Sequence, residues 1–591
     1  MTLAELVNKY HNNRANYIKS SYNETQLRSE FLDTFFELLG WDIKNVSGKS
    51  TNEREVLLEE ALKANASENT KKPDYTFRLY SERKYFVEAK KPSVKIEVDD
   101  EKAKQVRRYG FTAKLKISVL SNFEYLIIYD TSIKVEPTDN FQKAFLKKYH
   151  YTEYETKFDE IKKLLGRDEV YNGTFDEVWS DIETQINNYS IDTHFLKQIN
   201  EWRLQLGSEI YKADNKISEE RLNDTVQSYL NRILFLRVCE DREIEKYQTL
   251  LKFATQEDFN ALIKKFQEAD KYYNSGIFDQ LLSDAIIQNI SSVFWEIISH
   301  LYYPESPYSF TVFSSDVLGR IYEIFLSEKL IIANGKIGLV KKPENIDRDV
   351  VTTPTYIINH ILKETITTKC KDKTDKEILT MQFADIACGS GAFLLELFQL
   401  LNDIFIDYYL SNNPKTLIQT NIETFKLPFE IKTKILLNCI YGIDKDYNAV
   451  EATKFGLLLK LLENEDEETV DATKPILPSL DDNIFYGNSL IEAKAVKLRK
   501  DKTTINPFDF KKLKFDVIIG NPPYMKAEDM KNITPLELPI YKEIFKTAYK
   551  QFDKYFLFIE KGIELLKADG LLGYIVPSKF TKVGAGKELR E

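Results

Sequence analysis

The residues of this chain with the clearest chemical potential are Asn521, Pro522, Pro523 and Tyr524, which directly follow the apolar run 515–520. That run predicts a buried strand ending in a tight turn. The side-chain carbonyl of Asn521 and the backbone carbonyl of Pro522 can accept hydrogen bonds from an exocyclic NH2, which localises its lone pair for attack on an electrophile. The prolines remove competing backbone donors, and Tyr524 can stack on a ring. The motif therefore predicts a site for a planar amino substrate. The alternative is a plain β-turn, because Asn-Pro and Pro-Pro are common turn signals.

A glycine-containing turn lies upstream of this motif. Residues 381–393 predict a short strand, a turn and the start of a helix. Gly389 and Gly391 would let the backbone approach a ligand at the carboxyl end of a strand, where open parallel sheets bind nucleotides. The pattern lacks the third glycine of a dinucleotide fingerprint and the Lys-Ser/Thr pair of a phosphate-binding loop. The turn is weak evidence alone, but an acidic strand end, Asp385, precedes it.

Two further strand ends carry polar side chains that suit a nucleoside. Asp444 closes the segment 441–444 and is placed to bind both hydroxyls of a ribose, as acidic residues do at the second strand of such folds. Asn488, within 484–490, can hydrogen-bond the edge of an adenine. In order along the chain, the four strand ends predict an adenosine cofactor lying across the edge of a sheet.

This set of motifs resembles the amino-methyltransferases that use S-adenosylmethionine. The closer resemblance is to DNA adenine-N6 methyltransferases fused into single-chain restriction-modification enzymes (type IIG, Eco57I-like), and it covers roughly residues 311–591. It implies that 318–323 and 352–354 cover the methionine end of the cofactor, and that Phe580 packs on the target base. The cofactor-binding residues that the resemblance implies are Thr353, Pro354, Asp385, Ala387, Gly389, Gly391, Asp444 and Asn488.

The implied chemistry is a direct in-line methyl transfer to adenine. Hydrogen bonds to Asn521 and Pro522 localise the amino lone pair, and no strong base is needed before attack. A base inside a duplex is out of reach, so the target must be flipped out of the helix. One departure from the family pattern is the spacing of Asp385 and Asp444, which are 59 residues apart, whereas a minimal unit needs about 20.

A second group of candidate catalytic residues lies near the amino terminus. Asp74 opens an apolar segment, and Glu88 and Lys90 fall on one face of the next segment because side chains alternate along a strand. Two carboxylates can hold Mg2+, which activates a water against a phosphodiester, while the lysine stabilises the developing negative charge. The alternative is a solvated hairpin with ordinary charges. The pattern resembles the PD-(D/E)xK nuclease core, which implies accessory roles for Glu30 and Gln105.

The chain therefore predicts an α/β multidomain protein. We expect a nuclease domain over 1–155, a helical connector over 156–310 and a Rossmann-like methyltransferase domain with a mostly parallel sheet over 311–591. Apolar residues at helical spacing support the connector assignment. Length and an apolar content of 43% are sufficient for several cores.

Composition limits the setting of this chemistry. The four cysteines are scattered and the five histidines show no ligand spacing, which predicts a reducing cytosol and argues against zinc. We find no secretory signal or transmembrane run and expect a cytoplasmic protein. The net charge is −10, but residues 71–116 hold 14 basic and 7 acidic side chains and 494–514 hold 8 and 2. Both basic stretches adjoin a candidate site, as double-stranded DNA requires.

The family continues past the point where this chain stops, into further strands and a DNA target-recognition domain. We therefore expect a separate specificity subunit, or a recognition domain outside this chain, and weak DNA binding by the chain alone. Three other functions remain open: an adenine methyltransferase whose nuclease-like domain only binds DNA, a protein glutamine methyltransferase, and a non-catalytic subunit that binds the cofactor.

Overall fold

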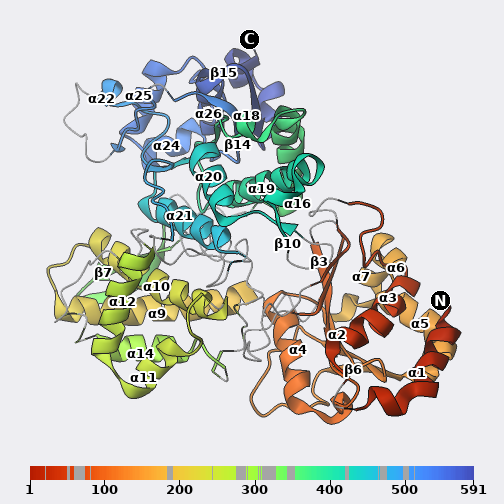
Figure 1. The fold of residues 1–591 in the computed structure, drawn as a ribbon. Coiled ribbons are helices and arrows are strands. Elements are labelled where there is room, and N and C mark those ends of the chain that lie inside the picture. The colour runs from red at the N-terminus through yellow and green to blue at the C-terminus, as the bar shows by residue number, and fades with distance from the viewer. Residues whose placement is uncertain are drawn as a thin grey trace.

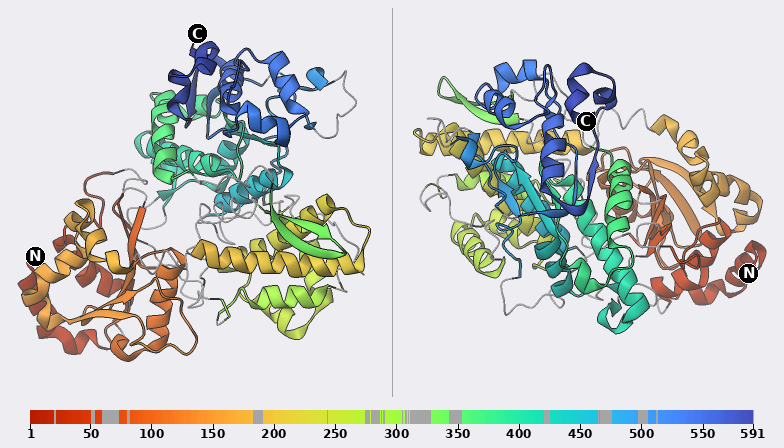
Figure 2. Two further views of the ribbon diagram at one scale, coloured as in Figure 1. Left: turned by 180° about the vertical axis from the view of Figure 1, so that it is seen from behind. Right: turned by 90° about the horizontal axis from the view of Figure 1, so that it is seen from above.

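The protein is described by a computed structural model in which three lobes are visible (Figure 1). The two chain ends lie in different lobes, as the views from behind and from above also show (Figure 2). The structure describes residues 1–591 except 20–21, 50–53, 59–72, 80–81, 183–190, 243, 274–277, 279–285, 287, 289, 304, 307, 309, 311–327, 343–352, 420–424, 464, 466–475, 497–504, 512 and 591.

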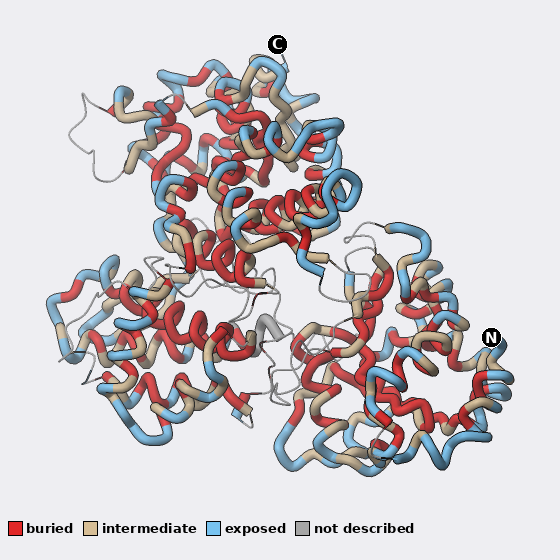
Figure 3. The backbone as a smooth tube through the Cα atoms, viewed as in Figure 1, coloured by how far each residue is buried: buried red, intermediate tan, exposed pale blue. Residues whose placement is uncertain are grey.

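The first lobe is built on a six-stranded mixed sheet in the order β1-β2-β3-β4-β5-β6. Only the β3–β4 pair is parallel, because α4 connects these two strands across one face. Apolar residues on the other face pack against α1, α3 and α5, so helices cover both faces. Because helices cover both faces of the sheet, the central strands carry apolar side chains on both faces. These strands are buried along their length (Figure 3).

The core of this first lobe extends beyond the sheet. It includes side chains from α5 to α7 and reaches Ile182. The helices of the lobe are α1 (Leu3–Tyr17), α2 (Glu24–Leu27), the π-helix η1 (Arg28–Leu32), α3 (Asp33–Leu38), η2 (Ile96–Val98), α4 (Asp100–Thr112), η3 (Tyr151–Glu153), α5 (Tyr154–Leu165), α6 (Arg167–Tyr171) and α7 (Thr174–Val178). Its strands are β1 (Val56–Leu58), β2 (Tyr75–Leu79), β3 (Glu82–Ala89), β4 (Ile117–Ser121), β5 (Tyr125–Asp130) and β6 (Phe145–His150).

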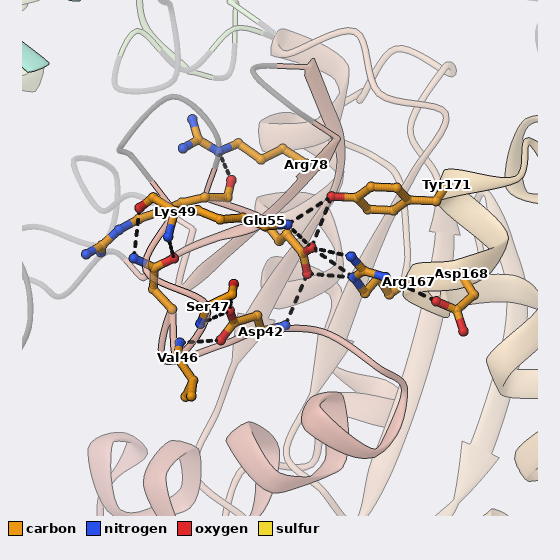
Figure 4. Close-up of polar contacts among 11 residues, drawn as sticks. Asp42, Val46, Ser47, Lys49, Glu55, Arg78, Arg167, Asp168 and Tyr171 are labelled. Carbon is orange, nitrogen blue, oxygen red and sulfur yellow. Dashed lines mark hydrogen bonds and ion pairs between the residues drawn. The ribbon is translucent and has the colours of Figure 1, made fainter.

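Glu55, a buried acid directly before β1, connects the start of this strand to α6. The Glu55 carboxylate is 2% exposed and accepts hydrogen bonds from Arg167 at 2.8 and 2.9 Å, from the Tyr171 hydroxyl at 3.0 Å and from Lys49 (Figure 4). Burial alone would raise the pKa of Glu55, but these hydrogen bonds lower it to about 2. The cluster therefore connects Lys49 and Glu55 to a helix that lies more than a hundred residues later in the sequence.

We expect Glu55→Gln to destabilise the first lobe at pH 7 by about 3 kcal/mol, because a pKa unit corresponds to about 1.4 kcal/mol. The folded-state pKa lies below the usual value for glutamate. The contribution is therefore fully present above about pH 4.5 and is lost as the pH falls toward 2. Thermal unfolding of both proteins followed by circular dichroism between pH 7 and pH 3 measures the difference. Glu155→Gln, at an exposed position of α5, is the control. Equal stability of Glu55→Gln and the unmodified protein at pH 7 would contradict the assignment.

The second lobe is mainly helical, as predicted. Its described helices are α9 (Ile191–Ala213), α10 (Glu219–Asp241), α11 (Thr249–Gln256), α12 (Phe259–Tyr273) and α14 (Ser291–Ser299), and they are followed by a hairpin of β7 (Glu328–Ala333) and β8 (Lys336–Lys341). Helix α10 is buried on most sides because it packs against its own lobe and against α21 (Tyr447–Leu461) of the third lobe. One continuous apolar cluster joins the second lobe to one face of the third sheet.

The third lobe is built on a five-stranded sheet in the order β13-β12-β9-β14-β15, in which every neighbouring pair is parallel. The chain leaves the central strand β9 (Phe383–Asp385), builds β12 (Ile440–Asp444) and β13 (Ile484–Tyr486) on one side, and then returns to β14 (Phe515–Gly520) on the other. The strand order thus reverses between β9 and β14. This position is the topological switch point, and open parallel sheets bind ligands at the carboxyl ends of such strands. The predicted α/β fold with a parallel, Rossmann-like sheet is confirmed.

The helices of the third lobe cover both faces of this sheet. One face packs against α19 to α21 and the other against α24 to α26. The remaining elements are α16 (Thr355–Leu362), the π-helix η5 (Lys363–Thr367), α17 (Thr368–Cys370), α18 (Asp375–Ile378), α19 (Ala392–Asn412), η6 (Pro414–Thr416), β10 (Ile418–Gln419), β11 (Phe425–Lys426), α20 (Phe429–Cys439), α22 (Ala493–Val496), α24 (Ala527–Ile533), α25 (Glu537–Ile544), α26 (Lys554–Leu565), β15 (Leu566–Tyr574), η7 (Ser578–Thr581), η8 (Gly584–Gly586) and α27 (Lys587–Arg590). Two helices and a small hairpin between β9 and β12 account for the long spacing of Asp385 and Asp444.

Helix α4 connects the first lobe to the second. Its Phe111 ring stacks on Tyr308 with centroids 6.1 Å apart and belongs to the apolar cluster of the second lobe. The guanidinium of Arg108 donates to the Tyr308 carbonyl at 3.5 Å and lies over the Tyr303 ring. One side of α4 therefore belongs to the interface between the lobes. None of the described helices is both long enough and apolar enough to cross a bilayer.

Candidate active sites

The acidic end of β9 and the tetrapeptide after β14 lie side by side at the switch point. Gly520, the last residue of β14, has a φ of +147°, and a Cβ at this position would lie 2.7 Å from the Asp385 carboxylate. Only glycine permits this close approach of the strand to the acid. The sheet therefore brings together the predicted cofactor acid and Asn521, which are far apart in the sequence.

Asp385 is a buried acid with an unusual charge environment. It is 2% exposed, and its carboxylate accepts a hydrogen bond from the Ala387 backbone N–H at 3.0 Å. Burial raises the pKa of Asp385 to about 7, and the nearby Asp444 carboxylate adds to this rise. Among the described residues no cation pairs with Asp385, so a positively charged ligand at this position would stabilise its ionised form.

The glycine turn after β9 is fixed by its neighbours. The Gly389 N–H donates to Asp444 at 2.9 Å, and the Gly389 carbonyl accepts from the Thr453 hydroxyl at 2.8 Å. A side chain at Gly391 would collide with Thr453, whereas nothing lies within 4 Å of the Cβ position of Gly389. The turn thus brings Asp385, Gly389 and Asp444 together beside an open space.

Asn488 is placed differently from the other predicted cofactor residues. Its side chain is 4% exposed, donates to the Tyr541 hydroxyl at 3.4 Å and accepts from the Leu490 N–H at 3.1 Å. Tyr541 in turn donates to Glu537 at 2.8 Å, and the Lys554 ammonium lies 3.4 Å from the same carboxylate. Sequence reasoning missed this buried network, because nothing in the local sequence connects positions in three separate segments.

The tetrapeptide 521–524 contacts the segment that was predicted to cover the cofactor. The Asn521 side-chain N–H donates to the Thr353 hydroxyl at 3.1 Å, and Pro354 follows Thr353 as the N-cap of α16. The Tyr524 hydroxyl lies 2.5 Å from the Asn521 side-chain oxygen and 2.9 Å from the Ile575 carbonyl. Pro522 is buried and Pro523 is exposed.

Other predicted segments are placed less completely. Residues 318–323 and Thr352 lie outside the described residues. Phe580 is half-buried and lies 6.5 Å from the ring of Tyr555, which is itself 5.8 Å from the Tyr524 ring. These three aromatic rings form a row next to the tetrapeptide.

In the first lobe, strand pairing brings the second set of predicted residues together. Tyr75 pairs with Val87, so Asp74 stands opposite Glu88 on the neighbouring strand. The Asp74 carboxylate accepts from the Ala89 N–H at 2.7 Å and from the Arg28 guanidinium at 3.0 Å. Arg28 begins the π-helix η1, a rare turn that often marks functional sites. Sequence reasoning did not find Arg28, because it lies 46 positions before its partner.

Glu88 and Lys90 form a buried ion pair beside Asp74. One oxygen of Glu88 accepts from Lys90 at 2.5 Å and from the Gln105 amide of α4 at 3.2 Å, so the predicted accessory glutamine does contact the site. The other oxygen, Oε2, is buried and has no hydrogen-bond partner among the described residues. Burial raises the pKa of Glu88, and the charge of Lys90 opposes that rise. An unpartnered buried carboxylate oxygen fits a ligand to a hard cation.

A third acid completes this cluster, and it is not the predicted one. Glu24 lies 4.0 Å from the Lys90 ammonium, whereas Glu30 pairs with Lys9 at 3.4 Å. Both carboxylates are 37% exposed, so the distance to Lys90 is what distinguishes Glu24 from Glu30. The sequence pattern alone does not reveal which acid lies near Lys90.

The chain is similar to known restriction-modification proteins. Residues 438–591 match the family described as Eco57I restriction-modification methylase. The chain is 58% identical over 590 residues to the type II restriction enzyme and methyltransferase RM.Eco57I of Escherichia coli, which covers 100% of this chain and 59% of the relative. It is 31% identical over 217 residues to the type II methyltransferase M.BstVI of Geobacillus stearothermophilus, which covers 36% of this chain and 35% of the relative.

A solved structure of a DrdV–DNA complex aligns with 100% of this chain and 51% of that chain, at 14% identity and a TM-score of 0.40, and no assignment rests on it. The chain spans 59% of the length of RM.Eco57I. Its similarity to that relative nevertheless runs along the whole chain and includes both candidate sites. The resemblance to Eco57I-like restriction-modification proteins that the motifs predicted is therefore confirmed.

Proposed function

We propose that this protein transfers a methyl group from S-adenosylmethionine to the N6 amino group of adenine in double-stranded DNA. The observation that carries the proposal is the close approach of Gly520, the residue directly before Asn521, to the Asp385 carboxylate at the switch point of a parallel sheet. Residues that can accept hydrogen bonds from an amino group and residues that can bind a nucleoside thus lie at the same edge of the sheet. The 58% identity to a restriction enzyme and methyltransferase supports the same activity.

The residues around Asp385, Gly389 and Asp444, here called the cofactor cradle, suit S-adenosylmethionine in charge and in shape. Asp385 supplies a buried negative charge that suits a cationic ligand, and the open space at Gly389 leaves room beside Asp444 for a ribose. We assign cofactor binding to Thr353, Pro354, Asp385, Ala387, Gly389, Gly391, Asp444 and Asn488. S-adenosylmethionine supplies an electrophilic methyl group on a sulfonium centre.

The residues of the tetrapeptide act on the adenine. The Asn521 side-chain oxygen and the Pro522 carbonyl accept hydrogen bonds from the two N6 protons, which draws the nitrogen lone pair out of conjugation with the ring. Pro523 keeps the loop rigid. The Tyr524 ring stacks on the flipped base, and base–aromatic stacking is worth about 1–3 kcal/mol. That gain offsets part of the cost of extruding the base.

For the first lobe we propose Mg2+-dependent cleavage of DNA. Asp74 and Glu88 would hold the ion, and the unpartnered Oε2 of Glu88 is the atom that suits it. Lys90 would position a water and stabilise the charge that develops on the phosphate. The ion lowers the pKa of a bound water and so supplies the nucleophile.

A second candidate for the first lobe is a DNA-binding domain without cleavage activity. The ion pair between Arg28 and Asp74 favours it, because both Asp74 oxygens already have partners in the structure. Metal binding in the first candidate requires Asp74 to exchange Arg28 for the ion. The arrangement into a nuclease unit (1–155), a connector (156–310) and a methyltransferase unit (311–591) stays a prediction, and packing up to Ile182 favours a later first boundary.

The proposed activity is tested by incubating the 591-residue protein with tritiated S-adenosylmethionine and mixed-sequence duplex DNA, with and without Mg2+. We expect N6-methyladenine in the nucleoside digest. Single-stranded oligonucleotides rich in adenine are included, because they spare the enzyme the cost of base flipping. Label in protein glutamine instead of DNA would identify a protein methyltransferase, and no label in either would refute catalysis.

A further inference from the structure

Two segments far apart in the chain hold the amide of Asn521 at opposite ends. Its nitrogen donates to the Thr353 hydroxyl at 3.1 Å, and its oxygen lies 2.5 Å from the Tyr524 hydroxyl. Thr353 is 168 positions earlier in the sequence and is 9% exposed, so water does not compete strongly for its hydroxyl. The amide is therefore fixed in one of its two orientations.

The orientation decides whether the amide can serve the proposed reaction. An asparagine amide keeps nearly the same shape when it turns by 180°, but its carbonyl accepts hydrogen bonds and its NH2 group only donates. An adenine amino group needs an acceptor in front of it. In the turned orientation, the NH2 group of Asn521 would face both the amino group of the base and the Tyr524 hydroxyl. Lone-pair localisation would then be lost.

We propose that Thr353 is a positioning residue that sets the orientation of the Asn521 amide, in addition to any contact with the cofactor. The inference rests on the proposed methyl transfer to an amino group. The Thr353 hydroxyl accepts a hydrogen bond from the Asn521 nitrogen and so keeps the oxygen turned toward the substrate side. Thr353 acts through Asn521 and does not touch the reacting atoms.

The neighbouring tyrosine makes this contact more important during catalysis. The Tyr524 hydroxyl carries one proton and lies within reach of two acceptors, the Asn521 oxygen and the Ile575 carbonyl at 2.9 Å. When a substrate amino group donates to Asn521, the Tyr524 proton can turn to Ile575 without moving the ring. The Asn521 oxygen then no longer has the Tyr524 hydroxyl as a partner. The hydrogen bond from the Asn521 nitrogen to Thr353 keeps the amide oriented.

The test compares Thr353→Val, which keeps the shape but removes the hydroxyl, with Thr353→Ser, which keeps the hydroxyl. A buried donor left without an acceptor typically costs about tenfold to a hundredfold in an equilibrium or rate. We expect kcat for methyl transfer to fall by that factor in Thr353→Val and to return to within about threefold in Thr353→Ser. The rate is measured at saturating S-adenosylmethionine, and calorimetry on both variants should show any loss of cofactor affinity to be smaller than the loss of kcat. Thr367→Val, at an exposed threonine of η5, is the control.

Each outcome bears on the proposal. Unchanged kcat in Thr353→Val overturns it. A loss of cofactor affinity that accounts for the whole loss of rate also overturns it, because Thr353 would then act only on the cofactor. Failure of Thr353→Ser to restore the rate has the same meaning, since the hydroxyl would not be the relevant group. If the unmodified protein transfers no methyl group to DNA, the proposed function itself fails. The rate measured for the unmodified protein shows this separately from the effect of the variants.

Discussion

Asn521→Ala should lower kcat for methyl transfer by about 10²–10³-fold, the range seen when one positioned hydrogen-bonding group is removed from a reacting centre. The Asn521 oxygen is the only side-chain carbonyl in the tetrapeptide. Alanine keeps the loop short and removes the acceptor, while the backbone carbonyl of Pro522 remains. The rate is measured with tritiated S-adenosylmethionine and an adenine-containing oligonucleotide.

The same variant should bind the cofactor almost normally, because the cradle is formed by other residues. Gly520 and Asp385 keep their close approach when only the side chain of Asn521 changes. Asn532→Ala, at an exposed asparagine of α24, serves as the matched control and should leave the rate unchanged. An active Asn521→Ala protein would remove the basis for assigning the methyl acceptor to this rim of the sheet.

Glu88→Gln should reduce Mg2+-dependent DNA cleavage by about 10²–10³-fold, because a neutral amide is a poor ligand for a hard cation and leaves the ion's charge uncompensated. Lys90→Ala should cause a comparable loss, because the developing phosphate charge loses its stabilising cation. Cleavage is followed as loss of supercoiled plasmid at fixed Mg2+, and methyl transfer is measured on the same preparations. We expect methyl transfer to be unaffected, since the two sites lie in different lobes.

The controls for this experiment come from the same part of the chain. Glu82 lies at the exposed end of β3, so Glu82→Gln changes the same charge without touching the cluster. Lys95→Ala does so for the lysine. Cleavage that persists in Glu88→Gln would show that the metal lies elsewhere. If the unmodified protein binds DNA but does not cleave it with Mg2+, the second candidate is correct and the Arg28–Asp74 ion pair is its explanation.

The sequence predicts the strands and the residues at their ends well, because these depend on local patterns. The apolar run before Asn521, the glycines after Asp385 and the alternation around Glu88 each mark a strand end within a few positions. In the structure, the strand order then makes β9 and β14 neighbours, so that Asp385 and Asn521 lie at adjacent strand ends.

Partnerships between distant segments are not visible in the sequence. The bonds from Asn521 to Thr353, from Asp74 to Arg28 and from Asn488 to Tyr541 each join positions from 46 to 168 residues apart. Single threonines, arginines and tyrosines occur throughout the chain, and no local pattern distinguishes these from the others. The same holds for the acid near Lys90, because the sequence does not distinguish Glu24, which approaches Lys90, from Glu30, which pairs with Lys9.

Helix α4 has a practical consequence for protein engineering. Gln105 on this helix contacts Glu88, while Phe111 on the same helix is buried in the apolar cluster of the second lobe. A first lobe cut out after its sheet would thus expose an aromatic ring on the same helix that contacts Glu88. To exchange the first lobe between related proteins, the residues around Tyr308 must be transferred with it, or Phe111 must be replaced by a polar residue.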